Sequence, residues 1–294
     1  MQNVVREEIE KLLSEKSGEP VEIYSTNSIG GGCINNASKI ETSIGSFFVK
    51  WNSNCHPDIF TREAESLSEL KTATGVELKV PKVYASKEVN TTPGFLVLEY
   101  LIPGYSAFDN DEKLGRGLAL IHRYSNKNFG FYTNNYCGAT LQDNSWKSNW
   151  AEFFTNNRLY FLLDLIQKER PLPASEIKIY EKLLEKIPEL VPDNSEPVLI
   201  HGDLWSGNYM ICKTGPALID PCAYYADREM EFAIMNMFGG FSQRFYAAYN
   251  EVNPLLPDWR QRNSLYQIYH ILNHYYLFGG GYQSQAIRVA RSFI

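Results

Sequence analysis

The spacing of apolar residues changes near residue 101, and this change divides the sequence into two parts. In the first part, a helical repeat near the N-terminus ends at Gly18. Most of the apolar segments that follow are short and bounded by turn residues, as strands are, whereas residues 60–72 have helical spacing. The predicted strands of this part cover residues 21–24, 38–42, 46–51, 80–86 and 95–101.

The second part is mostly helical. Pro103 and Gly104 break the last strand, and the only strand pair that we expect beyond them flanks residues 201–208. Strands with one helix, followed by helices around a small hairpin, predict an α+β fold of two lobes, residues 1–101 and 102–294. The predicted helices of the second part cover residues 109–124, 147–169, 174–187, 228–250 and 258–278.

Composition narrows the class of protein. The net charge is −6 and no extended basic run occurs, which disfavours nucleic acid or an anionic membrane as the main partner. Residues 1–19 lack the apolar core of a signal peptide, and no segment approaches the roughly 20 apolar residues of a membrane span. We therefore expect a soluble, cytoplasmic protein, and the sequence leaves monomer and homodimer both open.

Cysteine and histidine spacing gives little support for a metal site. The cysteines are odd in number and form no CxxC pair, so neither a disulfide framework nor zinc is indicated. His270 and His274 stand four residues apart on a predicted helix, which is a zinc-like spacing. No nearby acid completes a zinc motif that contains glutamate, and the aromatic neighbours of both residues favour packing. The five cysteines are Cys33, Cys55, Cys137, Cys212 and Cys222.

The most informative segment covers residues 201–208 and reads His-Gly-Asp-Leu-Trp-Ser-Gly-Asn, between two short apolar runs. The order of acidic and amide residues matches the part of a kinase site that accepts the proton and binds the metal: Asp203, Asn208, and Asp220 after the second apolar run. In that template Asp203 takes the proton of the acceptor hydroxyl, while Asn208 and Asp220 hold Mg²⁺. Gly207 permits the tight turn that lets Asn208 reach back. The alternative is a polar loop between two buried strands.

A glycine-rich segment between two predicted strands is the candidate for holding the donor phosphates of ATP. Gly30, Gly31 and Gly32 have no side chains, so backbone N–H groups could approach phosphate oxygens closely. The segment is neither GxGxxG nor a Walker A motif, and an ordinary turn is the alternative. Cys33 follows directly, and we hypothesise that its oxidation blocks ATP binding or bridges two chains; a small packed side chain is equally compatible.

Two further features are candidates for binding the nucleotide: a lysine for the phosphates and a strand end for the adenine. Lys50 ends an apolar strand, where a lysine is costly unless it is paired. We predict that it grips the α- and β-phosphates and is held by Glu63 of the next helix, with Glu65 as the other candidate. The adenine would pair with backbone groups near Glu99 and Leu101, at the end of the last strand of the first part. An ordinary edge strand is the alternative.

Over nearly its full length, the chain resembles the fructosamine kinases (ketosamine 3-kinases), which are related to aminoglycoside and choline kinases. The motif at residues 201–208 is close to diagnostic, because Trp205 and Ser206 are unusual in the wider kinase-like superfamily. Other segments similar to the family are residues 30–34, 48–50, 129–131, 137–138, 146–154, 237–241 and 272–274.

The resemblance implies ATP-dependent phosphorylation of the third-carbon hydroxyl of a ketosamine, either free or protein-bound, with Mg²⁺. Such phosphates are unstable and fall away, which frees the amine and amounts to deglycation repair. The roles given above to Lys50, Asp203, Asn208 and Asp220 carry over at matching positions. Trp205 is expected to stack on the sugar, with a packing role as the alternative.

The segment after Asp220 departs from the family pattern at Cys222 and Asp227, and we expect activity to survive both changes. Asp227, Glu229 and Glu231 form an acidic tract there. These acids could attract an acceptor that carries an amine, or they could offset the dipole of the helix that they begin.

Two other functions stay open from the sequence. One is a kinase for an aminoglycoside, choline or a similar amino alcohol, and the other is a pseudokinase that binds nucleotide without turnover. The second is disfavoured, because all four of the residues assigned to phosphate, metal and proton transfer are present.

Overall fold

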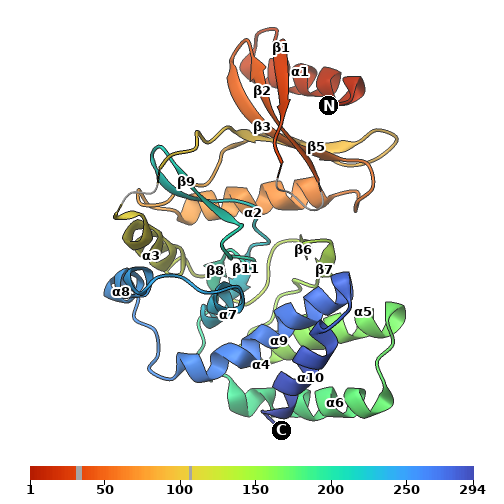
Figure 1. The fold of residues 1–294 in the computed structure, drawn as a ribbon, viewed down its shortest axis with the longest axis vertical. Helices are drawn as coiled ribbons and strands as arrows, with labels where there is room; N and C mark the ends of the chain where they lie inside the picture. Colours follow the sequence, from red (N-terminus) through yellow and green to blue (C-terminus); the bar gives the residue numbers. More distant parts are fainter. Residues whose placement is uncertain (31–34, 106–107) are drawn as a thin grey trace.

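The computed structural model describes residues 1–30, 35–105 and 108–294. It has an antiparallel sheet with two helices in the N-terminal part and a mainly helical C-terminal part (Figure 1). The N- and C-termini lie at opposite ends of the molecule (Figure 1). Gly31, Gly32 and Cys33 of the predicted phosphate loop lie outside the described residues.

The N-terminal sheet has five strands in the order β1-β2-β3-β5-β4, all antiparallel. Because successive side chains of a strand point to opposite faces, β5 is buried on both sides. Phe95 and Val97 belong to the core beneath the N-terminal helix α1, whereas Leu96 and Leu98 belong to the core beneath α2. The bounds are α1 Asn3–Ser17, β1 Ile23–Ser28, β2 Asn36–Thr42, β3 Gly45–Asn52, α2 Ile59–Ala73, β4 Val83–Lys87 and β5 Gly94–Glu99.

The helices of the C-terminal part differ from the prediction at two points, one of which is α10 (Tyr282–Arg291), a helix that was not predicted. The single helix predicted over residues 228–250 is wrong, because two helices, α7 and α8, occupy this stretch. Gly239 and Gly240 separate them with φ values of +101° and +72°, a left-handed backbone that ends a helix. The bounds are α3 Asn110–Ile121, α4 Trp150–Phe153, π-helix η1 Phe154–Tyr160, α5 Phe161–Glu169, α6 Ala174–Leu190, α7 Glu229–Met237, α8 Gln243–Val252, α9 Trp259–Phe278 and α10 Tyr282–Arg291.

The strand pairing around residues 201–208 is also more complex than predicted. The two apolar runs that flank this segment do not pair with each other. Strand β8 (Val198–Ile200) pairs with β11 (Tyr224–Ala226), while β9 (Tyr209–Cys212) pairs with β10 (Gly215–Leu218) across a two-residue turn. A third pair joins β6 (Asn135–Cys137) to β7 (Thr140–Gln142), so the expectation of a single pair was wrong.

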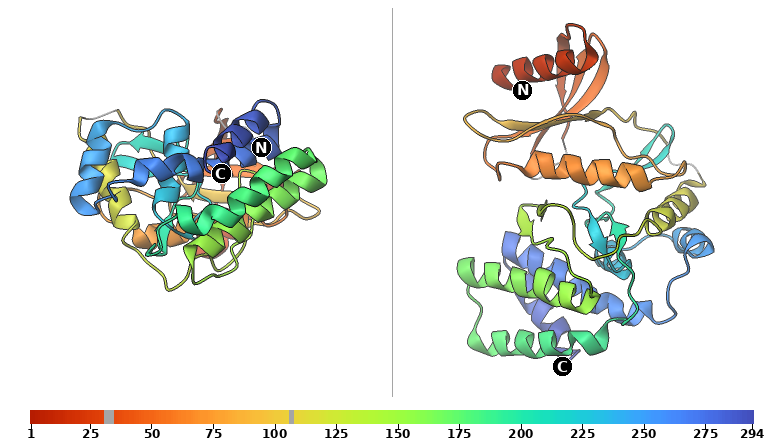
Figure 2. Two further views of the ribbon diagram at one scale, coloured as in Figure 1. Left: turned by 90° about the horizontal axis from the view of Figure 1, so that it is seen from below. Right: turned by 180° about the vertical axis from the view of Figure 1, so that it is seen from behind.

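The core beneath α2 continues into the C-terminal part, where it contains residues from α3 to α10. Backbone hydrogen bonds also join the two parts, because Lys79 N–H donates to Pro216 O at 3.0 Å and Leu218 N–H donates to Lys79 O at 2.9 Å. Helices α5, α6 and α9 lie at the end of the molecule far from the N-terminal sheet (Figure 2). The boundary between residues 101 and 102 stays a prediction. None of the described helices combines the length and hydropathy that crossing a bilayer requires.

Candidate active site

The loop after β8 brings Asp203 and Asn208 together. Asn208 Nδ2 donates to the backbone oxygen of Asp203 at 2.8 Å and to its carboxylate Oδ2 at 3.0 Å. The loop begins at Gly202, whose φ of +86° is left-handed, and a Cβ there would lie 2.4 Å from Cys222 O. Only glycine fits this close approach, so the glycine before Asp203 sets the path of the loop.

Gly207 makes room for the indole of Trp205. A Cβ at Gly207 would lie 2.4 Å from the indole ring, so any larger residue would push the ring away. The indole is 36% exposed, and its ring centroid lies 5.6 Å from that of Phe238. Trp205 therefore lies at the surface, two residues after Asp203, and is not part of the buried core.

Lys50 lies between two carboxylates. Its Nζ lies 2.8 Å from Glu63 Oε1 of α2 and also contacts Asp220 Oδ1. Glu65, the other candidate, pairs with Arg62 at 2.8 Å instead. Asp220 has φ +57°, which is positive for no other non-glycine residue in the described part of the chain. Such a backbone is uncommon outside glycine and persists where the surroundings hold it, as the Lys50 ion pair does here.

Burial shapes the charges of these groups. Burial opposes the charge of Lys50, but Asp220 and Glu63 outweigh it and raise the lysine pKa above its usual range. Burial also raises the pKa of Glu63, against the attraction of Lys50. The pKa of Asp203 is raised to about 8, chiefly by burial, although the Asn208 hydrogen bond opposes the shift. A carboxyl group with a pKa near neutrality suits a group that exchanges protons.

The buried side chain of His201 holds the loop that carries Asp203 through two hydrogen bonds. Its Nε2 lies 2.8 Å from Ile219 O, and the N–H of Asp203 points at its Nδ1 at 3.3 Å. Because a carbonyl only accepts, Nε2 carries the ring proton and Nδ1 is the acceptor. Burial lowers the His201 pKa, which favours this neutral form. His201 therefore ties the backbone at Asp203 to the backbone at Ile219, next to Asp220.

Glu231 of α7 is a second support, and one that the sequence did not reveal. Its fully buried carboxylate accepts hydrogen bonds from the backbone N–H groups of His201, at 2.5 Å, and Gly202, at 3.1 Å. His122 Nε2 lies 3.6 Å from the same carboxylate. The carboxylate is occupied by the loop that carries Asp203 and is therefore not free to attract an acceptor, while its place in the first turn of α7 agrees with the predicted effect on the helix dipole.

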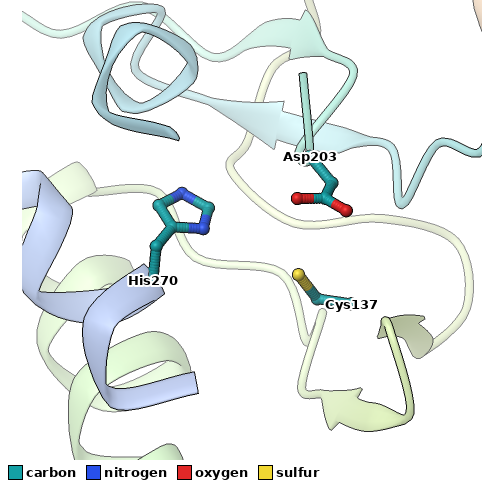
Figure 3. A group of neighbouring side chains, drawn as sticks. All are labelled: Cys137, Asp203 and His270. Atoms are coloured by element: carbon teal, nitrogen blue, oxygen red, sulfur yellow. The ribbon is translucent and has the colours of Figure 1, made fainter. Parts of the chain in front are cut away.

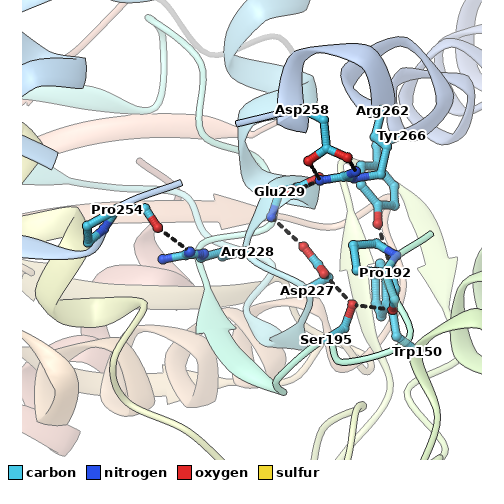
Figure 4. A network of polar contacts seen from close by, with 10 residues as sticks. All are labelled: Trp150, Pro192, Ser195, Asp227, Arg228, Glu229, Pro254, Asp258, Arg262 and Tyr266. Carbon is cyan, nitrogen blue, oxygen red and sulfur yellow. Dashed lines mark hydrogen bonds and ion pairs between the residues drawn. The ribbon is translucent and has the colours of Figure 1, made fainter. Parts of the chain in front are cut away.

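The other acids of that tract also face inward (Figure 4). Asp227 accepts from Ser195 Oγ at 2.5 Å and from the Glu229 N–H at 2.7 Å. The Glu229 carboxylate pairs with Arg262 through two contacts of 2.7 Å, and Arg262 also binds Asp258 (Figure 4). These contacts fix the start of α7 and thereby hold Glu231 in place.

Replacing Glu231 with glutamine should lower both stability and kcat. The amide has one acceptor oxygen and turns an N–H group toward a backbone donor, so one buried N–H loses its partner. The expected loss is about 1–3 kcal/mol of unfolding free energy, with a larger fall in kcat than in ATP affinity because the loop shifts. Urea unfolding and steady-state kinetics would measure both. Glu152→Gln, in an exposed ion pair, is the control, and an unchanged kcat in Glu231→Gln would contradict the positioning role.

The remaining nucleotide residues are only partly described. A Cβ at Gly30 would meet nothing within 4 Å. Glu99 ends β5, and its N–H donates to Lys82 O at 2.8 Å, which leaves the backbone of Leu101 as the candidate donor to an adenine. The roles of Gly30, Glu99 and Leu101, like those of the residues outside the described part, stay predictions.

A sheet with a buried, doubly paired lysine above a loop that carries Asp203 and Asn208 defines a protein-kinase-like fold. The fold matches that of a thermostable mutant of aminoglycoside phosphotransferase APH(4)-Ia, with a TM-score of 0.64 over 97% of this chain and 98% of that one, at 14% identity. The predicted α+β, two-lobed fold is confirmed.

The particular family follows from closer similarity. The family model described as fructosamine kinase matches residues 5–294. A protein-ribulosamine 3-kinase of Oryza sativa subsp. indica is 39% identical over 290 residues, which cover 96% of this chain and 82% of that protein. A crystal structure from Haemophilus somnus, described as a fructosamine-3-kinase, has a TM-score of 0.86 at 26% identity, with 97% and 96% of the chains covered. The chain belongs to the fructosamine kinase family, as its resemblance implied.

Proposed function

We propose that the protein is an ATP-dependent kinase that phosphorylates the third-carbon hydroxyl of a ketosamine. The observation that carries the proposal is a pair of interactions in one site. Lys50 forms ion pairs with Glu63 and Asp220, and Asn208 donates a hydrogen bond to Asp203. The rice relative is named for ribulosamine, and the family is named for fructosamine; both compounds are ketosamines. Free and protein-bound ketosamines are both proposed as acceptors.

The site residues divide the chemistry between them. Asp203 orients the acceptor hydroxyl and takes its proton, while Lys50 neutralises charge on the donor phosphates. Asn208 and Asp220 offer an amide oxygen and a carboxylate, the oxygen donors that Mg²⁺ prefers, and Asn208 points its NH₂ group at Asp203, which leaves its Oδ1 for the cation. These two residues would hold Mg²⁺, whose positive charge would neutralise negative charge on the donor phosphates.

The remaining nucleotide contacts are proposed from where two segments lie relative to the strands of the N-terminal sheet. The backbone around Gly30, Gly31 and Gly32 would approach the phosphates, and the backbone near Glu99 and Leu101 would meet the adenine. The lobe of residues 1–101 thereby holds ATP. The unstable 3-phosphate then falls away from the sugar and frees the amine, which gives the reaction its role in deglycation.

An aromatic surface next to Asp203 suits the sugar of the acceptor. Trp205 and Phe238 are 36% and 39% exposed, and the Phe238 ring centroid lies 5.3 Å from that of His274. Sugars present apolar C–H faces that stack on such rings. We assign Trp205 to acceptor binding with Phe238 and His274 beside it, and the sequence had indicated only packing for His274.

Turnover with a panel of acceptors tests the function. ATP consumption should occur with ribulosamine and fructosamine but not with choline or kanamycin. Turnover only with choline or kanamycin would favour the amino-alcohol kinase, and no turnover with any acceptor would favour a nucleotide-binding pseudokinase. In the same assay, Trp205→Leu should raise the KM for the ketosamine and leave the KM for ATP unchanged.

A further inference from the structure

Three side chains from separate elements converge next to the loop that carries the proposed base (Figure 3). Cys137 ends β6, His270 lies in the middle of α9, and Asp203 follows β8. One sulfur, one ring nitrogen and one carboxylate oxygen lie within 4.8 Å of one another. Asp203 is the only one of the three with a role in the proposed phosphoryl transfer.

The two ring nitrogens of His270 are buried without hydrogen-bond partners among the described residues. The side chain is 1% exposed. Burial lowers the pKa of His270 to about 3, so the ring is neutral and keeps a free lone pair. A buried polar atom without a partner is destabilising, and a cation bound by that nitrogen would remove this cost. Nδ1 of His274, the partner that the sequence spacing suggested, hydrogen-bonds to the backbone oxygen of His270 at 2.7 Å and not to its ring.

We propose that Cys137, Asp203 and His270 form a binding site for Zn²⁺, and that the bound ion inhibits the kinase by occupying the carboxylate of Asp203. Sulfur, imidazole nitrogen and carboxylate oxygen are all common zinc ligands. Mg²⁺ selects oxygen donors instead, so this set discriminates against the ion that the proposed reaction needs.

The geometry requires little movement. Zinc bonds of about 2.0–2.3 Å place tetrahedral ligand atoms roughly 3.3–3.8 Å apart, whereas the three atoms here lie within 4.8 Å. A contraction of about 1 Å would therefore complete the site. Water is the candidate for the fourth position, so Cys137 would be the one thiolate ligand of the ion.

Occupancy has a defined chemical effect. The Cys137 thiol and the Asp203 carboxyl, whose pKa is raised to about 8, release their protons to solvent as they bind the ion, and no electron is transferred. An Asp203 oxygen bound to Zn²⁺ no longer accepts the proton of the acceptor hydroxyl. The inhibitory effect rests on the proposed function, whereas the metal site itself does not.

Direct binding is tested on the full-length protein with Co²⁺ as a spectroscopic probe for Zn²⁺. We expect about one equivalent to bind with the charge-transfer absorption of a cobalt–thiolate bond, and Zn²⁺ should displace it. Cys137→Ser should lose this absorption, and His270→Gln should weaken binding by about tenfold or more. Cys212→Ser is the matched control, because Cys212 is a buried cysteine of β9 outside the cluster. The absence of this absorption in the wild type, or its survival in Cys137→Ser, would overturn the site.

Kinetics then test the inhibition at saturating Mg²⁺ and ATP. Zn²⁺ should inhibit the wild type and Cys212→Ser, whereas Cys137→Ser and His270→Gln should keep their turnover and resist about tenfold more Zn²⁺. Equal inhibition of all four proteins, relieved by extra Mg²⁺, would place the zinc at Asn208 and Asp220 and refute the inference. If either variant fails to fold, Asp203→Asn replaces it in the Co²⁺ titration, where unchanged binding counts against the site. Zinc binding without turnover of any ketosamine would refute the proposed function and leave the site standing.

Discussion

Asp203→Asn should lower ketosamine phosphorylation by about 10²–10⁴-fold, the range that general base catalysis typically contributes. The amide keeps the shape of the carboxyl group but cannot take the proton of the acceptor hydroxyl. The fold should survive, because burial disfavours the charged form of Asp203 and the replacement removes that charge. Asn208 Nδ2 would still find an oxygen to donate to.

The measurement separates chemistry from binding. Initial rates of ADP release give kcat, and calorimetry with a non-hydrolysable ATP analogue gives nucleotide affinity, which should change little. Asp164→Asn is a matched control, since that acid lies in an exposed ion pair with Lys168 on the surface of α5. If Asp203→Asn kept a kcat within about threefold of the wild type, Asp203 would not be the base.

Local patterns made part of this site predictable. Asp203 and Asn208 belong to one tight loop, so their contact follows from a five-residue spacing and the glycine between them. Lys50 and Glu63 lie on neighbouring elements, a strand and the helix after it, and the cost of burying an unpaired lysine required an acid nearby. For these residues, sequence spacing and spatial proximity are closely related.

Long-range pairing was not predictable in the same way. The strands around the loop could pair in several ways with similar apolar content, and only the tertiary structure selects β8 with β11 and β9 with β10. Glu231 looked like an acid in the first turn of a helix because sequence does not reveal what covers a helix face. The grouping of Cys137 with His270 joins residues 133 positions apart in the chain, so no spacing rule could find it.

Lys50→Met should both disable catalysis and destabilise the fold, and a second substitution should separate the two effects. A charged hydrogen bond is worth about 1.5–3 kcal/mol, so losing the grip on phosphate should lower kcat/KM by roughly 10- to 10²-fold. Without Lys50, Glu63 is left buried and unpaired, which should lower the unfolding free energy by about 3 kcal/mol. Lys50→Met with Glu63→Gln should recover most of that stability but none of the turnover.

The stability loss in Lys50→Met should depend on pH with a defined sign. Burial already raises the pKa of Glu63, and removal of the lysine raises it further, above the unfolded value of about 4.3. The folded state then binds a proton that the unfolded state has released, so the penalty is absent below about pH 4 and grows as pH rises through the folded pKa. Urea unfolding at pH 5 and pH 8 should give a larger difference from the wild type at pH 8, and Glu63→Gln in the double variant should remove that dependence. A double variant no more stable than Lys50→Met, or a penalty that shrinks toward pH 8, would contradict the pairing of Lys50 with Glu63 as the source of both effects.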